Sequence, residues 1–529
     1  MKRDLLLALT TSVLFSLAFP PLRLGFLAYI ALVPLFILLA EKNYRQAIRW
    51  GFITGFFMNL GTLYWISWVT VPGAIAAILY LPIYTVIYAL LHTLLRQRLP
   101  EKYFYWCVPF LWTGVEYLRS LGVLGFPWSS LAYTQTYYLS LIQYVSFTSV
   151  YGVSLWVATI NVVIWLLWQS TSRSKKLLLL FITLLLIFII PWIYGQLVLP
   201  DPSKVNEEKI RVGLIQGNID PFLKWDDAFL QENLMIYDRL SREAAQQQPQ
   251  LLIWPETAVP DYLRISSLYL NGIRKLLADI HTPLITGAPD FEYQADQSYL
   301  AYNAVFLLTP AQDSLPCYRK MHLVPFGERV PFTESFPFLK DFLERLEMGE
   351  GNFSPGNKVV SFTVPILDNE HSGATQMSLR HHILAPVVIC FESLFPEIVR
   401  QFIQNGADIL IIVTNDAWFK RSAAPFHHAQ VAIFRAIENR ISIARCANTG
   451  VSMFIDPYGR TIQATSIFET AVAVNDLPLR RKTTFFSEHG NIFSITISLF
   501  NVGPILAAIW MPRRSQKVAA STTSENKLA

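Results

Sequence analysis

Three ionisable residues stand beside apolar segments, and their combined chemistry suits acyl transfer. Cys390 directly follows the apolar run 387–389. Glu256 comes just after the apolar segment 251–254, and Lys320 precedes a further apolar stretch. A thiolate is an effective nucleophile, and a carboxylate can take its proton as a base and later return it as an acid. A lysine ammonium would stabilise the oxyanion of the tetrahedral intermediate and favour the thiolate.

A structural interpretation competes for each of these residues. Taken singly, Glu256 would be a turn carboxylate, Lys320 a surface charge and Cys390 a core thiol. The three residues together favour the catalytic interpretation, because the same chain also has a long apolar region of the kind that faces lipid, described below. We expect the other cysteines to be structural: Cys107 in an apolar span, Cys446 on the apolar stretch of a helix, and Cys317 packed in spite of its nearness to Lys320.

Metal, nucleotide and nucleic-acid chemistry find little support. The four cysteines contain no CxxC pair, so a disulfide framework or zinc ribbon is not expected. The pairs 381–382 and 427–428 are both His-His and raise a Cys-His or metal alternative, but neither has zinc-site spacing, and loop or helix-face positions are favoured. The chain contains neither a phosphate-binding loop nor a dinucleotide fingerprint, so we expect no cofactor. A net charge of +5 without a dense basic patch argues against nucleic acid.

Alternating strands and helices are expected to position the three residues. From residue 208 to 480, short β-branched runs alternate with helical patterns, which predicts an α/β domain. The expected strands are 210–216, 251–254, 283–286, 301–308, 385–390, 408–414, 451–455 and 471–475, and the expected helices are 229–240, 267–279, 397–404 and 424–446. Residues 329–380, richer in Pro, Gly and polar groups, are expected to form insertions or loops.

The rest of the chain has a membrane composition. The whole chain is 53% hydrophobic and only 15% charged, whereas soluble domains carry about 25% charged residues, and the apolar excess lies mostly before residue 200. Eight apolar segments are long enough to be membrane spans: 5–19, 24–40, 48–70, 73–95, 103–122, 139–168, 177–199 and 492–512. We therefore expect seven helices in residues 1–200, an eighth in 491–512, and a tail, 513–529. The first segment lacks a small-residue cleavage site, so a retained helix is favoured over a signal peptide.

Basic residues predict the orientation of these spans. Lysines and arginines cluster in alternate short loops: Lys2 and Arg3; Lys42, Arg45 and Arg49; Arg96, Arg98 and Lys102; Arg173, Lys175 and Lys176; and Arg513, Arg514 and Lys517. With eight spans all five clusters fall on the cytoplasmic side, and so do both termini and the tail 513–529. Residues 208–480 then lie outside the cytoplasm. A sixth cluster, 480–482, is on the other side; a solvated strand end is favoured there over contact with anionic lipid head groups.

Several motifs carry a resemblance to known proteins. The segments Trp254–Glu256 (WPE), Lys320–Glu328 (KMHLVPFGE) and Cys390–Glu392 (CFE) resemble the three signatures of the nitrilase superfamily. Residues 415–419 and 435–440 resemble the same superfamily. With its membrane segments, the chain over nearly its whole length resembles the apolipoprotein N-acyltransferase family. The resemblance implies a multi-span α-helical membrane domain plus an α/β nitrilase-like sandwich domain, and a Glu256, Lys320, Cys390 triad.

The resemblance also marks residues around the triad. These are Trp225, Asn303, Glu328, Phe391, Glu392 and Trp418. Glu328 and Glu392 are expected to orient Lys320 or bind the amine. Phe391 departs from the tyrosine common in this family, which removes a hydroxyl donor but leaves the thioester step intact. Trp128, in the outer loop 125–128, is either an interfacial anchor or a neighbour of the active site.

The implied reaction is a ping-pong transfer in the inner membrane of a bacterial cell. Cys390 would take an acyl chain from a membrane phospholipid and pass it to the α-amine of a diacylglyceryl-modified N-terminal cysteine. The catalytic domain would face the periplasm, and the partners would be prolipoproteins and membrane lipids. One rival is a membrane-tethered amidase or nitrilase-type hydrolase that uses the same three residues with water as acceptor. Another is a transporter or lipid-binding scaffold with a decayed enzyme domain.

Overall fold

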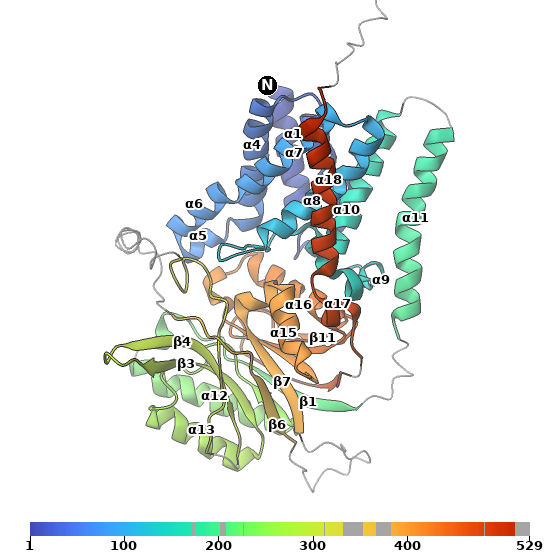
Figure 1. The fold of residues 1–529 in the computed structure, drawn as a ribbon. Helices are drawn as coiled ribbons and strands as arrows, with labels where there is room; N and C mark the ends of the chain where they lie inside the picture. Colours follow the sequence, from blue (N-terminus) through green and yellow to red (C-terminus); the bar gives the residue numbers. More distant parts are fainter. Residues whose placement is uncertain are drawn as a thin grey trace, which may run out of the picture.

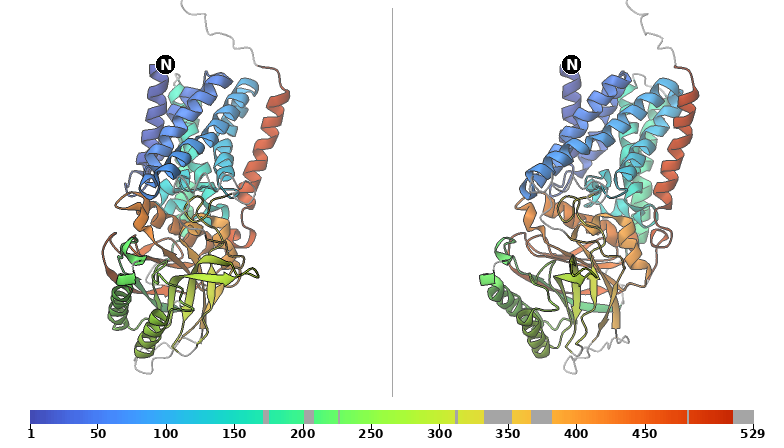
Figure 2. Two further views of the ribbon diagram at one scale, coloured as in Figure 1. Left: turned by 90° about the vertical axis from the view of Figure 1, so that its left-hand side faces the viewer. Right: turned by 60° about the vertical axis from the view of Figure 1, so that its left-hand side comes forward.

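The protein consists of a helical region stacked on a two-sheet α/β region (Figure 1). The computed structural model describes residues 1–170, 175–200, 208–225, 227–310, 313–331, 353–366, 382–480 and 482–513. Both the N-terminus and the end of the last helix lie at the end of the helical region that is far from the sheets (Figure 2). Some predictions concern residues outside the described ranges. These residues are 173, 381, 481, 514–529 and most of 329–380.

The helical region contains a helix, or a pair of helices, at each of the eight expected spans. The helices are α1 Lys2–Leu17, α2 Ala28–Ala31, α3 Val33–Leu39, α4 Tyr44–Leu63, α5 Ile66–Val69, α6 Val71–Tyr80, α7 Pro82–Arg98, α8 Glu101–Arg119, α9 Leu139–Ile142, α10 Val145–Gln169, α11 Lys175–Val198 and α18 Ile492–Trp510. Four stretches among the described residues are long and apolar enough to cross a membrane: Val71–Arg98, Val145–Gln169, Lys175–Val198 and Ile492–Trp510. That all eight cross stays a prediction.

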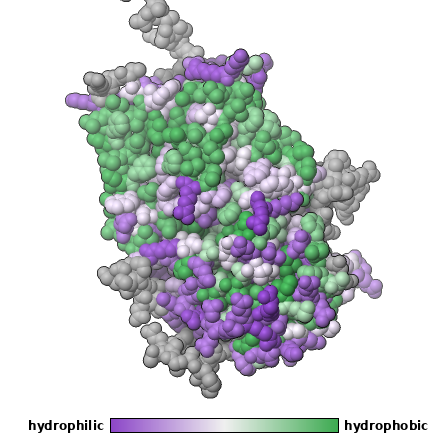
Figure 3. Space-filling view, turned by 180° about the vertical axis from the view of Figure 1, so that it is seen from behind, coloured by the Kyte–Doolittle hydropathy of each residue, from purple (hydrophilic) through white to green (hydrophobic). Residues whose placement is uncertain are grey.

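The surface of the helical region is predominantly apolar. Figure 3 shows a broad hydrophobic band over this region, with polar residues concentrated on the α/β region and at the opposite end. Helix α11 carries much of this apolar surface, because Leu178, Phe181 and Leu185 are all exposed. Such continuous apolar exposure is unfavourable in water and is typical of a surface that faces lipid.

Two six-stranded sheets form the α/β region. The first has the order β12-β1-β2-β3-β4-β5 and the second β11-β10-β9-β8-β7-β6. The strands of the first sheet are β1 Lys209–Gln216, β2 Leu251–Ile253, β3 Leu284–Tyr293, β4 Tyr299–Leu308, β5 Cys317–Arg319 and β12 Ala471–Pro478. Those of the second sheet are β6 Ser361–Pro365, β7 His382–Ile389, β8 Ile409–Thr414, β9 Ser442–Ala447, β10 Met453–Ile455 and β11 Thr461–Ala464. The central strands β1, β2 and β3, and β7, β8 and β9, run parallel.

The sheets pack face to face with helices on both outer sides, which gives a four-layer sandwich. Helices α12 Leu230–Ala245 and α13 Ser267–Ile280 cover the first sheet, and their apolar side chains form a core with it. Helices α15 Pro396–Gln404 and α16 Ala424–Asn439 cover the second sheet on the side of the helical region (Figure 1). A small helix, α17 Phe485–His489, leads into α18.

Helix α16 joins the α/β region to the helical region. The Glu438 carboxylate, at the end of α16, accepts hydrogen bonds from Ser149 Oγ at 2.6 Å and from the Val150 backbone N–H at 3.1 Å, both in α10. Arg435 pairs with the same carboxylate. One hydrophobic core contains buried residues of both regions, from Ala8 to Ala508. The site between the sheets is therefore held at a fixed place against the helices.

One predicted helix was wrong at its end. The expected helix 424–446 stops at Asn439, because Arg440 adopts the left-handed conformation with φ +46°, and Cys446 lies in strand β9. A short apolar run that is buried on both faces has no period by which to distinguish a strand from a helix. The short strands β5, β6 and β11 were not predicted, and the expected strand 451–455 is shorter, since β10 begins at Met453.

Candidate active site

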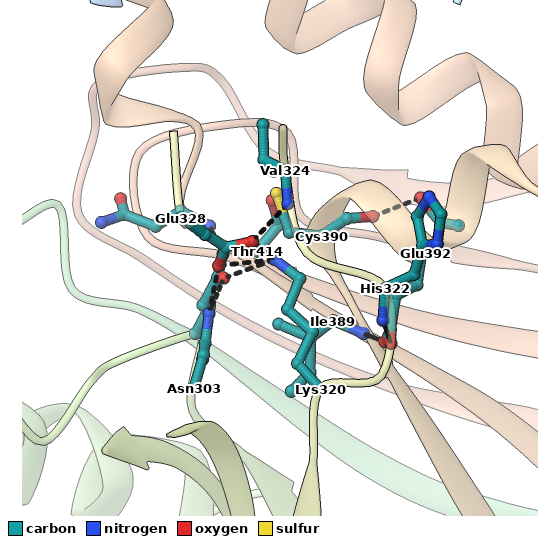
Figure 4. Close-up of polar contacts among 12 residues, drawn as sticks. Asn303, Lys320, His322, Val324, Glu328, Ile389, Cys390, Glu392 and Thr414 are labelled. Atoms are coloured by element: carbon teal, nitrogen blue, oxygen red, sulfur yellow. Dashed lines mark hydrogen bonds and ion pairs between the residues drawn. The ribbon is translucent and has the colours of Figure 1, made fainter. Parts of the chain in front are cut away.

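The three predicted catalytic residues converge from three strand ends between the two sheets. Glu256 follows β2 and Lys320 follows β5, both in the first sheet, whereas Cys390 follows β7 in the second. The ends of parallel strands open at one edge of a sheet, so residues that are distant in sequence meet there. Figure 4 shows Lys320 and Cys390 approaching each other from the two sheets.

Lys320 is surrounded by carboxylates. Its ammonium lies 2.8 Å from Glu328 and 3.6 Å from Glu256 Oε1, and the side chain is almost fully buried. Burial alone would lower the pKa of Lys320, but Glu328 and Glu256 outweigh burial and raise the pKa above its ordinary value. The lysine is therefore a permanent cation, as oxyanion stabilisation requires.

Both oxygens of the Glu256 carboxylate are held by donors. Asn303 Nδ2 donates to Glu256 Oε1 at 2.8 Å. It also donates to Glu328 Oε1 at 2.8 Å (Figure 4). The backbone N–H of Asn415 donates to Glu256 Oε2 at 2.8 Å. Glu328 is fixed in turn by the Val324 backbone N–H at 2.8 Å. The carboxylate that faces Cys390 is thus oriented before any substrate arrives.

Cys390 sits on a tight turn between β7 and the 3-10 helix Cys390–Leu394. Its backbone has φ +51°, a conformation that is uncommon for residues other than glycine, asparagine and aspartate. Burial, reinforced by the Glu256 carboxylate, raises the pKa of the Cys390 thiol, and the Lys320 ammonium acts in the opposite direction. The thiol form of Cys390 is thus favoured, so an attack by this residue would need a base, and Glu256 is the carboxylate with the largest effect on the thiol.

Glu392 is occupied by backbone N–H groups and by one tyrosine hydroxyl. Its Oε1 accepts from the Tyr318 hydroxyl at 2.6 Å and the Met321 N–H at 2.8 Å, and its Oε2 accepts from the Ile389 N–H at 2.8 Å. Burial raises the pKa of Glu392, and the Tyr318 hydrogen bond opposes this rise. The carboxylate connects the segment after Lys320 with the strand before Cys390, so it acts on both residues through the backbone.

Aromatic residues separate the site from the helices. Phe391 is buried against His322, with ring centroids 5.7 Å apart, and against Phe395 at 5.1 Å. Trp128 is buried too: its ring centroid lies 4.8 Å from that of Trp65 and 5.4 Å from that of His428. An interfacial anchor would be exposed to head groups, so the geometry favours the alternative that makes Trp128 a neighbour of the site.

Two predicted tryptophans lie at the rim. Trp225 is half exposed on the short 3-10 helix Leu223–Trp225. Trp418 belongs to the 3-10 helix Asp416–Phe419, which follows Asn415, and its ring packs against Phe222 with centroids 5.6 Å apart. They flank the Glu256 side of the site.

His428, for which a helix-face position was favoured over a Cys-His site, lies on α16 and is buried near Cys390. His428 Nε2 lies 3.1 Å from the Cys390 carbonyl oxygen, and Nδ1 lies 2.8 Å from Asp416 Oδ1. Asp416 also pairs with Arg445 at 2.9 Å. Burial would raise the pKa of Asp416, but Arg445 and His428 outweigh it and lower the pKa below its ordinary value. This buried network supports the backbone of the Cys390 turn.

The remaining histidines and cysteines lie apart from this chemistry. His427 is buried against Phe19, with ring centroids 5.4 Å apart. In the part of the chain that the structure describes, no three His, Cys, Asp or Glu residues are grouped as a metal site. Burial raises the pKa of Cys317 and of Cys446 to about 12 each, and Cys107 is buried in α8. Cys317 also lies beside a carboxylate, but both oxygens of Asp290 are paired with arginines, Arg264 and Arg319.

Comparison with known proteins covers both regions of the chain. Residues 11–163 match the family model for the apolipoprotein N-acyltransferase N-terminal domain, and residues 211–484 match that for carbon-nitrogen hydrolases. The apolipoprotein N-acyltransferase of Geobacter metallireducens is 36% identical over 93% of each chain. That of Chlorobaculum tepidum is 32% identical over 96% of this chain and 97% of its own. Among solved structures, an amidase from Nesterenkonia sp. is 20% identical, with a TM-score of 0.35, over 52% of this chain and 92% of its own.

Proposed function

The chain belongs to the apolipoprotein N-acyltransferase family, and we propose that it moves a fatty acyl chain from a phospholipid to the α-amine of diacylglyceryl-modified lipoproteins through a thioester on Cys390. The observation that carries the proposal is the meeting of Cys390, Glu256 and Lys320 between the two sheets. Aromatic contacts connect the surroundings of these groups with the apolar helices: Trp65 packs on Trp128, and Phe126 packs on Phe391. A lipid donor and a lipid-anchored acceptor explain why a nitrilase-like site is joined to such helices.

In the first half-reaction, Cys390 acquires the acyl group. Glu256 takes the proton of the thiol, and Sγ attacks the ester carbonyl carbon of the phospholipid. The Lys320 ammonium stabilises the oxyanion that forms. When the intermediate collapses, the carbon–oxygen bond to glycerol breaks. Glu256 returns the proton to the departing alkoxide, so a lysophospholipid leaves and the thioester remains.

In the second half-reaction, the α-amine of the acceptor attacks the thioester carbonyl. Glu256 accepts a proton from the attacking nitrogen, and Lys320 again stabilises the oxyanion. The carbon–sulfur bond then breaks, an amide forms, and Sγ recovers its proton from Glu256. Each step therefore uses the same three side chains, and the site is restored after one turnover.

The proposed location is the inner membrane of a bacterial cell, with the α/β region in the periplasm. The basic residues of the short loops support this orientation. Lys2, at the start of α1, and Arg513, just after α18, lie at the end of the helical region away from the sheets (Figure 1). Positive charge marks the cytoplasmic end of membrane helices. Both termini would then be cytoplasmic.

Trapping of the thioester tests the proposal. Purified protein is mixed with a phospholipid labelled in its acyl chain, without acceptor, and analysed by intact-protein mass spectrometry. We expect one acyl mass on Cys390 that is transferred when a diacylglyceryl-cysteinyl peptide is added. Label released as free fatty acid, with none on the peptide, would identify a hydrolase instead. In cells depleted of the protein, unchanged triacylation of lipoproteins would contradict the transferase.

A further inference from the structure

The short segment before α12 shows an inverted burial pattern. Phe222, Leu223 and Trp225 are 75%, 53% and 51% exposed, whereas Lys224 between them is 2% exposed. In a water-soluble surface loop the lysine would face outward and the large apolar residues inward. This segment therefore presents an apolar outer face and directs one ammonium into the protein.

The turn that produces this pattern is built by hydrogen bonds. The Asp220 side chain accepts from the Phe222 backbone N–H at 2.8 Å, and the Asp220 carbonyl accepts from the Lys224 N–H at 3.1 Å. Asn448 holds the preceding residue twice, through the Ile219 N–H at 3.0 Å and the Ile219 carbonyl at 2.7 Å. The inward direction of Lys224 thus follows from a fixed backbone.

The same hydrogen-bond network leads to the catalytic base. Asn448 Nδ2 donates to Asn415 Oδ1 at 3.1 Å, and the Asn415 N–H donates to Glu256 at 2.8 Å. Lys224 is also within the electrostatic reach of this carboxylate. Burial lowers the pKa of Lys224 to about 8, and Glu256 acts in the opposite direction. Lys224 thus lies on the Glu256 side of the site.

The ammonium of Lys224 makes no hydrogen bond with any residue that the structure describes. Lys320, equally buried, is bonded to Glu328 at 2.8 Å. An ammonium that is removed from water without a partner is strongly unfavourable, and buried charges are normally paired. A buried cation at the rim of an active site is therefore suited to an anionic group that arrives with a ligand.

We propose that Lys224 binds the phosphodiester of the donor phospholipid and that Phe222, Leu223 and Trp225 contact its acyl chains. The proposal rests on the proposed function. The phosphodiester is the only anion common to phospholipid donors, whereas the acceptor brings an amine that an ammonium would repel. The transient oxyanion is already stabilised by Lys320 in the proposed mechanism. An ammonium is an effective ligand for phosphate, and the neighbouring apolar face matches an amphiphile rather than a soluble anion.

Two acyl donors separate this role from a merely structural one. Thioester formation on Cys390 is followed by intact-protein mass spectrometry with a phospholipid and, separately, with the uncharged p-nitrophenyl ester of the same fatty acid. For Lys224→Met we expect phospholipid acylation at subsaturating donor to fall roughly 10- to 100-fold, and acylation by the ester to stay within about twofold. Lys224→Arg should recover part of the loss. Lys275→Met, on the exposed face of α13, is the matched control.

Each outcome decides the proposal. Equal losses of acylation rate with both donors would show that Lys224 maintains the structure of the site and does not bind the phosphodiester, which would overturn the proposal. An unchanged rate with phospholipid would overturn it as well. Strong competition by millimolar inorganic phosphate in the wild type would reassign Lys224 to a soluble anion. Wild-type protein that reacts with the ester but never with phospholipid would refute the phospholipid donor itself, and the Lys224 proposal with it.

Discussion

The backbone N–H of Asn415 donates to Glu256 Oε2 at 2.8 Å, and this bond crosses from one sheet to the other. Asn415 follows β8 of the second sheet, whereas Glu256 follows β2 of the first. The carboxylate that we propose as the base for Cys390 is therefore oriented by the packing of the whole sandwich. Its preorganisation is a property of the fold rather than of one loop.

Replacing the nucleophile should abolish the acyl adduct. Cys390→Ala removes Sγ, and we expect acyl transfer to fall by a factor of at least about 10³. The measurement is intact-protein mass spectrometry after exposure to phospholipid. Cys317→Ala is the matched control: that thiol is partly buried beside Asp290 and should be dispensable. An adduct of unchanged amount on Cys390→Ala would place the thioester elsewhere.

Removing the cation of the site should slow both half-reactions. Lys320→Met deletes the charge that faces Glu256 and Glu328, and loss of one oxyanion donor lowers rates about 10²- to 10³-fold. Single-turnover acylation and deacylation rates report the two steps separately. The exposed Lys358→Met provides a control of equal charge change. A variant slowed in only one step would mean that Lys320 serves one intermediate and not both.

The two adjacent histidines of α16 should differ in their effects. His428→Leu removes the contact with the Cys390 carbonyl and leaves Asp416 short of a partner, so we expect about 1–3 kcal/mol lower stability and about tenfold slower acylation. His427→Leu changes the packing against Phe19 and the hydrogen bond with the Pro20 backbone, both in the helical region, and should leave the rate of the folded enzyme unaltered. Thermal unfolding in detergent and the acylation rate distinguish them. Equal rates for the two variants would contradict a positioning role for His428.

The free energy of unfolding should decrease at acidic pH because of His322. Burial, assisted by the Lys320 ammonium, lowers the pKa of His322 from 6.5 to about 4. Between these values the unfolded chain binds a proton that the folded protein excludes, so stability is retained above pH 6.5 and decreases as the pH falls towards 4. His322→Phe should reduce this loss by about 1–3 kcal/mol. Unfolding at pH 7 and pH 4.5 measures the difference, and parallel losses in wild type and variant would disprove the assignment.

The parts of the fold and site that could be predicted are those that a short stretch of sequence specifies by itself. The buried strands appear as short apolar runs, and Cys390 follows one of them directly. Glu256 and Lys320 were identified because each stands in a motif beside such a run. The second sheet was harder to predict at its edges, where β6 and β11 are short and partly exposed. Strand β9 was hidden because a left-handed arginine, Arg440, ends the preceding helix without a glycine.

The features that could not be predicted depend on contacts between distant segments. His428 and Asp416 meet only when α16 packs beside the turn after β8, and a pair of histidines on a helix gives no sign of this contact. Lys224, between Leu223 and Trp225, would be taken from the sequence for the exposed member of an apolar group, whereas the fold makes it the buried one. The burial of a charge is decided by tertiary structure, which local sequence does not encode.

The hydrophobic core shared by the helical and α/β regions has a practical and an evolutionary consequence. Expression of residues 208–480 alone would expose to water the face of α16 that packs on α10, with the Glu438 carboxylate deprived of Ser149. Such a fragment should aggregate rather than act as a soluble catalyst. The two regions can therefore be inherited, exchanged or engineered only as one unit.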